Sequence, residues 1–427
     1  MKAESSANAS RPLTGLDLAA MGVNAVVGSS IFLFPGKLAE LLGPASIAAF
    51  LLTALLLAPV ALCFAEAAST RDSAGGPALY AQEAFGPTAG FSIGWLCWVT
   101  EIVSFAAVAS GLATYAAPFF SFLDGPWASK IVAAAAIGAF GAVNLRGAKP
   151  GARVSTTLTV AKLLPLIAIA LAGLPLVLKG GISPFAPKGW SGLPKACFLA
   201  YFAFQGFEVV PVPAGEVKDP RRAAPLAVLS ALALAAVLYA FVQAAALSAV
   251  PGLAGSQRPL ADAGLALFGP VGERLIAAGA LVSMLGFVAG CALGGPRYLV
   301  ALAEEGHFPA AFARRSPATG APTAAVLWTA GVSACVALAM NFDSLIDFGN
   351  VVIGAQYLAT CAAVLVERGR GRVSGFRAPG GPLVPVAGLA ATIWLGAQGG
   401  GAQLAAAAVV LGAGFAVRRL TRAAVKG

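Results

Sequence analysis

Residues 45–65 read ASIAAFLLTALLLAPVALCFA, which is twenty-one consecutive positions without a charged side chain. A helix needs about 20 residues to cross the hydrocarbon core of a bilayer. Similar apolar runs recur along the 427 residues, of which 59% are hydrophobic and 11% charged, whereas soluble domains carry about 25% charged residues. Inside lipid, backbone N–H and C=O groups must be paired within their own segment, and runs this long fit helices better than alternating barrel strands. The sequence therefore predicts an all-α integral membrane protein.

The apolar runs predict twelve transmembrane helices, an even number that places both termini on the same side of the membrane. The expected spans are residues 13–43 and 195–217, each with a break, and the continuous segments 45–66, 88–120, 130–145, 154–178, 224–249, 275–303, 323–340, 345–366, 382–398 and 401–417.

The distribution of basic residues predicts the orientation of the chain. Of the 28 lysine and arginine residues, nineteen fall on the side that would hold both termini, six on the opposite side and three within spans. Basic residues concentrate in cytoplasmic loops, so both termini are expected in the cytoplasm. The formal charge of +10 thus indicates topological anchors rather than a nucleic-acid-binding surface.

Two of the expected spans are interrupted. In the first, residues 28–32 read GSSIF and are followed by Pro35-Gly36; in the sixth, Gln205-Gly206 interrupts an aromatic run, and two prolines follow at 211 and 213. Glycine tolerates unwound backbone. Paired broken helices in corresponding halves of a membrane protein indicate a transporter site at the bilayer midplane. The alternative is that glycine and proline only kink packed helices.

The first break also carries a family resemblance. GSSIF at 28–32 resembles the GSGIF signature in helix one of the amino acid/polyamine/organocation (APC) superfamily of permeases. Ala65-Glu66, with SAGGP at 73–77 and EAFGP at 83–87, is similar to the region between helices two and three of that superfamily.

The second break extends the resemblance over nearly the whole chain. FQGFE at 204–208, with GEVKDPRR at 215–222, is similar to helix six of these permeases and the loop after it. Arg297 and ALAEEGHFP at 301–309 are similar to the end of helix eight. One departure is Ser30, where the superfamily usually has glycine, so a hydroxymethyl group would narrow the approach to the backbone there.

The resemblance implies a LeuT-type fold, a 5+5 inverted repeat with broken helices one and six and two added helices. The expected divisions are a cytoplasmic tail at 1–12, a first repeat at 13–178, a second repeat at 195–366, two additional helices at 382–417 and a cytoplasmic tail at 418–427.

The resemblance also implies secondary active transport of amino acids across a bacterial cytoplasmic membrane by alternating access, with proton-coupled symport as the preferred mode. A sodium-independent amino acid or polyamine exchanger or exporter is the alternative. The partners expected are an amino acid or related amine, membrane lipid and a proton as candidate coupling ion. A channel or a membrane receptor is the alternative from another class, although no filter-like tract occurs in the sequence.

The unwound part of helix one predicts a carboxylate site. Free N–H groups of Ser29, Ser30 and Ile31 would lie at the start of the outer half-helix, where the helix dipole favours an anion. Such a site binds a carboxylate through backbone N–H groups and needs no charged side chain.

Unwound carbonyl groups predict the complementary ammonium site. The candidates are the carbonyls of Val26, Val27, Phe202, Ala203 and Gln205. By resemblance, Phe202 would also be an aromatic gate above the substrate, and packing bulk is the alternative for its side chain.

Lys162 is the candidate coupling residue. It lies eight residues beyond Val154 and so about 12 Å along helix five, inside the bilayer. A sodium site of the type that uses helix-eight hydroxyls is disfavoured, because no Ser or Thr occurs between Met284 and Arg297. By resemblance, Lys162 matches a lysine of proton-coupled members, and the alternative is a permanently charged pin between helices one, five and eight.

Three other charged residues within or near spans, Glu101, Glu208 and Arg297, also need a role, because ionisable groups in membranes are costly. Glu101 is expected to face the distal end of the substrate, with a hydrogen bond to a neighbouring helix as the alternative. Glu208 is expected to accept backbone N–H bonds at the helix-six break. Arg297 is expected to pair with Glu66 or Glu216, as a gate or a static brace.

The sequence does not favour an enzyme. No span carries a cluster of metal-ligating residues or a convincing Ser/His pair, and no cofactor or metal is expected. The six cysteines fall within apolar runs and are expected to pack as small hydrophobic residues. His307, the single histidine, is expected in a loop at the surface.

Overall fold

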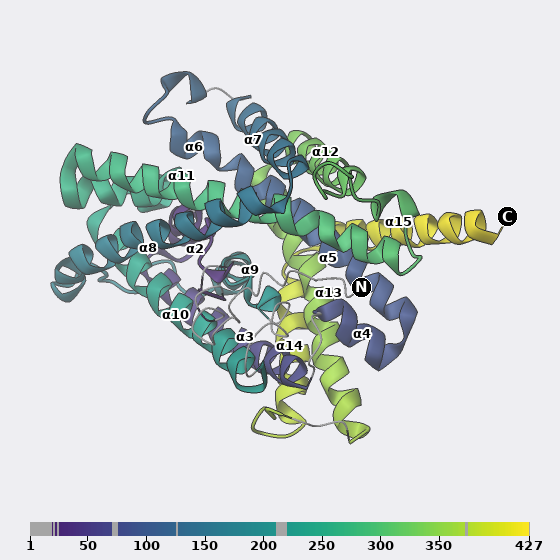
Figure 1. Ribbon diagram of the computed structural model, residues 1–427. Coiled ribbons are helices and arrows are strands. Elements are labelled where there is room, and N and C mark those ends of the chain that lie inside the picture. Colours follow the sequence, from purple (N-terminus) through teal and green to yellow (C-terminus); the bar gives the residue numbers. More distant parts are fainter. Residues whose placement is uncertain are drawn as a thin grey trace, which may run out of the picture.

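The computed structural model describes residues 19, 22–23, 25–70, 76–124, 127–210, 220–371 and 375–426. All regular secondary structure within these residues is helical (Figure 1). The predicted all-α class is confirmed.

The helices of the first five expected spans follow one another along the chain. They are α2 (Ser30–Leu42), α3 (Ser46–Ser69), α5 (Pro87–Ser110) continued by α6 (Leu112–Ala116), α7 (Ala128–Leu145) and α8 (Ala148–Leu178).

The remaining seven spans also contain helices. They are α9 (Leu193–Ala203), α10 (Pro220–Ala249), α11 (Pro259–Glu304), α12 (Thr323–Ala339), α13 (Phe342–Gly369), α14 (Leu383–Ala397) and α15 (Gly401–Lys426).

Length and composition allow seven of the described helical segments to cross a bilayer. Residues 30–69 form one such segment, which contains α2 and α3, and three shorter apolar helices occur at 162–178, 323–339 and 383–397. α2 and α9 are only 13 and 11 residues long. Each is too short to cross alone, because its span is broken.

Three features depart from the expected boundaries. α11 begins at Pro259, well before the predicted start at 275, because two helices join across a kink at Gly269. α15 continues to Lys426 instead of ending at 417. The amphipathic helix α4 (Pro77–Phe85) precedes α5 and was not expected from the hydropathy pattern.

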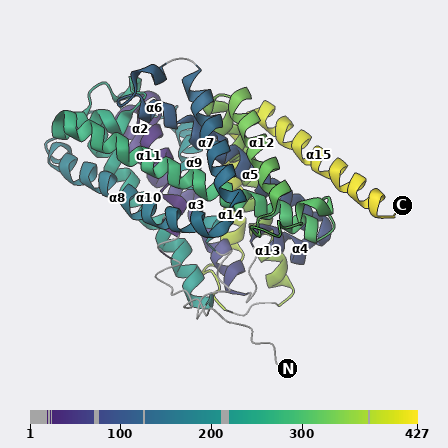
Figure 2. The ribbon, with the colours of Figure 1, turned by 45° about the horizontal axis from the view of Figure 1, so that its top comes forward.

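Small residues let the long helices approach closely, as is common inside membranes. A Cβ atom on Gly173 of α8 would lie 2.3 Å from the Cβ atom of Ala245 in α10. A Cβ atom on Gly279 of α11 would lie 2.6 Å from Cγ of Pro165 in α8. α8 is thereby held between α10 and α11, and α10 also packs along α3 (Figures 1 and 2).

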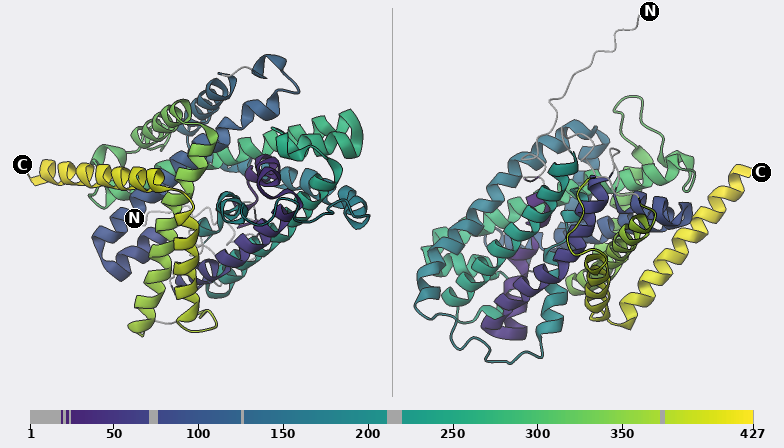
Figure 3. Two further views of the ribbon diagram at one scale, coloured as in Figure 1. Left: turned by 180° about the vertical axis from the view of Figure 1, so that it is seen from behind. Right: turned by 90° about the horizontal axis from the view of Figure 1, so that it is seen from below.

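α15 lies at the edge of the bundle and its C-terminal end projects from the body (Figure 3). It packs against α5 and α13. His307, in the loop after α11, was expected at the surface, and this prediction is wrong: the residue is 6% exposed. Its ring packs on Phe91 and lies beside Arg422 of α15, so α15 helps to cover it.

Candidate functional site

The first helix break lies between residues 26 and 30. Residues 25–26 are helical, residues 27–29 are not, and α2 starts at Ser30. The Gly28 amide donates to the Val26 carbonyl over 2.8 Å, and the Phe32 amide donates to the Ser29 carbonyl over 3.0 Å. Within the described residues, no acceptor contacts the amides of the three residues between them, Ser29 to Ile31.

The second break meets the first. α9 ends at Ala203, a turn follows, and a short 3₁₀ helix spans Phe207–Val209. Gly206 in the turn has φ +125°, and a Cβ atom there would lie 2.4 Å from the Ala25 carbonyl oxygen. Only glycine fits both the torsion angle and the contact.

Tyr239 of α10 links the two breaks. Its hydroxyl oxygen lies 2.8 Å from the Val26 carbonyl oxygen and 3.0 Å from the Ala203 carbonyl oxygen. A hydroxyl has one proton to donate, whereas each carbonyl can accept two hydrogen bonds. Two of the carbonyls predicted for an ammonium group therefore already contact a protein donor. The sequence reasoning missed Tyr239, whose only signal is a single tyrosine within an Ala/Leu-rich helix.

Glu208 lies directly after the second break and is 8% exposed. Its two carboxylate oxygens accept from the Gly206 amide over 3.0 and 2.9 Å. The Tyr357 hydroxyl of α13 donates to the same carboxylate over 2.8 Å. Glu208 thus accepts a backbone N–H bond in the turn after α9 and also joins this turn to α13.

Polar residues on one face of α13 contact α9 and the turn after it. The Gln205 side chain donates to the Asn350 side chain over 2.7 Å. The Asn350 amide in turn donates to the Phe198 carbonyl of α9 over 2.6 Å. The Lys195 ammonium lies 3.0 Å from both Asp347 oxygens. These α13 residues were not singled out from the sequence, because nothing local indicates which helix they face.

An aromatic layer covers the breaks on the α2 side. The ring centroid of Phe34 lies 6.0 Å from that of Phe202 and 6.1 Å from that of Phe342. Lys37 of α2 forms an ion pair with Asp343 of α13 beside this layer. Phe202 is 7% exposed, so its side chain lies in the interior, and its role as a gate stays a prediction.

Glu101 lies in α5 and faces α11. A Cβ atom on Gly294 would lie 3.9 Å from Oε1 of Glu101, and one on Gly295 would lie 3.6 Å from its Cβ. The Cys291 thiol of α11 is a polar group beside its carboxyl group. Both expectations for Glu101, a place facing the distal end of the substrate and a hydrogen bond to a neighbouring helix, stay predictions. Within the described residues Glu101 has no ion pair.

Lys162 is 4% exposed within α8 and is engaged in an interaction within the protein. It lies one turn before Pro165, the residue that meets Gly279 of α11. Ser283 lies one turn beyond Gly279, is 1% exposed, and its hydroxyl has no partner within the described residues. Ser283 precedes the interval searched in the sequence, so it was missed.

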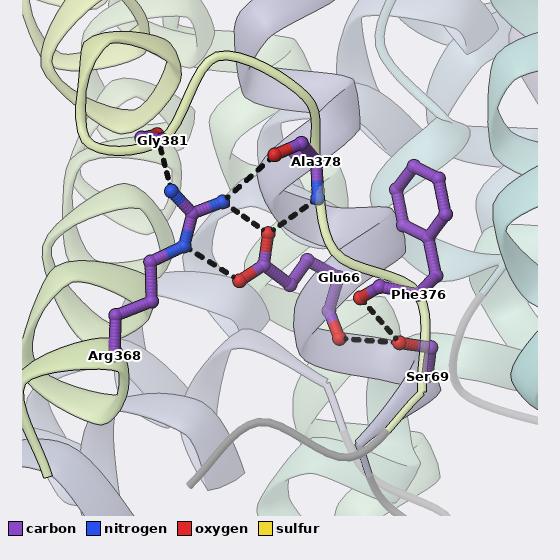
Figure 4. Close-up of polar contacts among 6 residues, drawn as sticks. All are labelled: Glu66, Ser69, Arg368, Phe376, Ala378 and Gly381. Atoms are coloured by element: carbon purple, nitrogen blue, oxygen red, sulfur yellow. Dashed lines mark hydrogen bonds and ion pairs between the residues drawn. The ribbon is translucent and has the colours of Figure 1, made fainter. Parts of the chain in front are cut away.

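Glu66 does not pair with Arg297, so this part of the prediction is wrong. Its carboxylate faces Arg368 of α13, with Oε1 2.7 Å from Nε and a second contact between Oε2 and Nη2 (Figure 4). The Ala378 amide donates to Oε2 over 2.8 Å, and Arg368 also donates to the Gly381 carbonyl. Arg297 is exposed and has no ion pair within the described residues.

The physical reason is that Arg368 and the loop at 375–382 surround Glu66 with a complete set of donors. Glu66 is 3% exposed, and a buried carboxylate is stable only when it is paired and hydrogen-bonded. Glu216, the other predicted partner of Arg297, lies outside the described residues.

A family profile described as amino acid permease matches residues 13–402 of the chain. Among curated proteins, the chain is 27% identical to the methylthioribose transporter of Bacillus subtilis, over 90% of this chain and 87% of that protein. It is 30% identical to human cationic amino acid transporter 4, over 84% of this chain and 60% of that protein. It is 27% identical to the serine/threonine exchanger SteT of Bacillus subtilis, over 87% of each.

Among solved structures, the chain resembles MhsT in complex with L-phenylalanine, with a TM-score of 0.63 at 16% identity. The likeness covers 91% of this chain and 99% of that chain. At this identity it shows the fold alone, and the expected LeuT-type architecture with broken helices one and six is confirmed.

Proposed function

We propose that this chain, which belongs to the amino acid permease family, is a secondary transporter that carries amino acids across the cytoplasmic membrane by alternating access. The observation that carries the proposal is the contact of the two helix breaks at Gly206 and Ala25. It brings the turn after α9, in the proposed second repeat at 195–366, against the helical residues that directly precede the first break, in the proposed first repeat at 13–178. The excess of basic residues on one side supports cytoplasmic termini.

The amides of Ser29, Ser30 and Ile31 are the proposed carboxylate site. No protein acceptor within the described residues occupies them, and they lie at the N-terminus of α2, where the helix dipole stabilises an anion. The side chain of Ser30 is 5% exposed, so its hydroxymethyl group shapes the space at this site.

The carbonyls of Val27, Phe202 and Gln205 are the proposed ammonium site, because neither break pairs them fully. Ala203 can add one acceptor, since the Tyr239 hydroxyl contacts its carbonyl at one lone pair. The Val26 carbonyl already contacts both the Gly28 amide and the Tyr239 hydroxyl, so it can accept from an ammonium group only if one of these donors is displaced. This pairing of amides with carbonyls recognises a zwitterion and does not suit a sugar or a simple ion.

Glu101 is the proposed determinant of the substrate side chain. It is a carboxyl group without an ion pair among the described residues, it faces the glycines of α11, and the Cys291 thiol lies beside it. A cationic distal group would supply the missing charge, and a neutral substrate would require a protonated Glu101. The likeness to a cationic amino acid transporter supports testing cationic substrates first.

Two ion pairs and one buried cluster are the proposed gates. Lys37–Asp343 and Lys195–Asp347, with Phe202 beneath them, would close the outer side. The Glu66 cluster would brace the cytoplasmic side.

For coupling we propose proton symport through Lys162. Exchange without a coupling ion is the second candidate, and the likeness to a serine/threonine exchanger favours it. In that case Lys162, which already has an interaction within the protein, would be a charged structural pin.

Reconstitution tests the proposed function. Purified protein in proteoliposomes should take up one radiolabelled amino acid, and a panel of the twenty amino acids and polyamines should compete selectively. Internal substrate should accelerate uptake, as it does for a carrier. Flux that never saturates and shows no acceleration would indicate a channel instead.

A further inference from the structure

The end of α15 carries a buried arginine whose donors are not all used. Arg418 is 6% exposed. Its guanidinium carbon lies 4.8 Å from the centre of the Phe91 ring, and Nη1 lies 3.3 Å from the Thr88 hydroxyl. Its Nε atom has no partner within the described residues. An unpaired buried donor on a charged group is costly, so this guanidinium is set for a further acceptor.

A second arginine and the only histidine lie beside it. Nη2 of Arg422 is 3.5 Å from Nδ1 of His307. Burial, together with the charges of Arg418 and Arg422, lowers the pKa of His307 below its ordinary value. Glu305 is the acidic group here, 3.8 Å from His307 and 46% exposed. Two arginine charges thus outnumber the one exposed carboxylate of Glu305, so the cluster of Arg418, Arg422 and His307 keeps net positive charge.

An apolar pocket adjoins this cluster on α15. It is shallow and open to the outside, with a volume of about 610 Å³, and all of its lining residues belong to α15: Gly412, Phe415, Ala416, Arg419 and Leu420. Phe415 also packs on Phe91, with ring centres 5.6 Å apart, so the pocket and the cluster share a wall. The pocket therefore combines an apolar floor with a cationic rim.

We propose that the cluster and the pocket bind one anionic phospholipid. Its phosphate accepts hydrogen bonds from Arg418 and Arg422, and its acyl chain lies in the pocket formed by Gly412 and Phe415. Free phosphate would satisfy the arginines but would leave the apolar pocket unfilled. A lipid uses both, and the basic end of α15 is expected at the membrane surface, where anionic headgroups attract such residues.

Native mass spectrometry of the full chain, purified in detergent and supplied with phosphatidylglycerol or phosphatidylcholine, tests the proposal. Wild-type protein should retain phosphatidylglycerol in preference to phosphatidylcholine. Arg418→Gln/Arg422→Gln should lower that retention by about fivefold for each arginine, the ratio for about 1 kcal/mol per basic group near an anionic surface. The charge-matched control is Arg146→Gln/Arg377→Gln, because both residues are exposed and lie in other loops.

A pocket-filling variant separates a lipid from a free anion. A Cβ atom on Gly412 meets nothing within 4 Å, so Gly412→Leu adds a side chain to the pocket and leaves all charges in place. It should lower phosphatidylglycerol retention as well. If Gly412→Leu has no effect and inorganic phosphate displaces the lipid, the site binds a free anion and the proposal is wrong. Equal losses in the two arginine double variants would also overturn it. Neither readout depends on transport.

Discussion

Gly206 and Ala25 are in contact across the two helix breaks, so closely that a Cβ atom on residue 206 would lie 2.4 Å from the Ala25 carbonyl oxygen. The two residues are 181 positions apart and belong to different repeats. At their contact the turn after α9 lies against the helical residues that directly precede the first break.

Gly206→Ala should abolish uptake and lower the unfolding temperature in detergent. The alanine would be strained at φ +125° and would also push against Ala25, at a cost of about 1–3 kcal/mol for the torsion alone. Gly306→Ala is the matched control, because Gly306 has φ +71° but no atom within 4 Å of its Cβ position. Equal effects of the two changes would mean that the contact with Ala25 does not matter.

Local patterns allowed the breaks to be predicted. Glycine, serine and proline interrupt apolar runs at residues 28–36 and 205–213, and an interruption is visible without knowing what lies opposite. The partners across the breaks could not be predicted in the same way. Tyr239 and Asn350 lie in otherwise ordinary helices, and only the packing of those helices brings them to the breaks.

The partner of Arg297 was predicted wrongly for the same reason: it depends on how the helices pack, which the local sequence does not show. Arg297 and Arg368 both lie near helix ends on the predicted cytoplasmic side, so charge complementarity alone allowed either to meet Glu66. The choice depends on α13 packing beside α3 and on the loop that brings Ala378 over the carboxylate. Neither can be deduced from the apolar pattern.

Tyr239→Phe should weaken both the fold and transport. Removing the hydroxyl leaves the buried carbonyls of Val26 and Ala203 with one donor fewer, which costs about 1–3 kcal/mol. Tyr201→Phe is the control: Tyr201 is equally buried, but its hydroxyl has no partner within the described residues. Thermal unfolding and initial uptake rates should fall only for Tyr239→Phe, and equal losses would refute the linking role.

Arg368→Gln should destabilise the protein strongly. It leaves Glu66, which is 3% exposed, without its cationic partner, and breaking a buried pair costs about 3–5 kcal/mol. Hydrogen exchange at Ala378 should accelerate too, because its amide bonds to the same carboxylate. Arg297→Gln should leave both measurements close to wild type. The reverse result would restore the pairing of Arg297 with Glu66.

Glu101→Gln should change the order of preferred substrates. If its carboxylate faces the distal group, cationic amino acids should lose about tenfold in competition against neutral ones, equivalent to about 1.4 kcal/mol. Glu304→Gln, an exposed carboxylate at the end of α11, removes the same charge away from the interior. An unchanged ranking in Glu101→Gln would remove the residue from the substrate site.

The role of Lys162 can be tested with a variant that keeps the positive charge but cannot release a proton. Arginine stays protonated at any physiological pH, so Lys162→Arg keeps a positive charge near Gly279 of α11 but cannot release a proton. If Lys162 carries the coupling proton, wild-type uptake should rise when the external side is acidic, and this rise should disappear in both Lys162→Arg and Lys162→Ala. Exchange of internal for external substrate, which needs no net proton movement, should survive in Lys162→Arg. Lys179→Ala, which changes an exposed lysine at the end of the same helix, should keep the full pH response.

A structural pin would give the opposite pattern: Lys162→Arg would behave like wild type, and Lys162→Ala would lose uptake and exchange together. Uptake driven by sodium, or a pH response that survives in Lys162→Ala, would exclude the proton-carrier role.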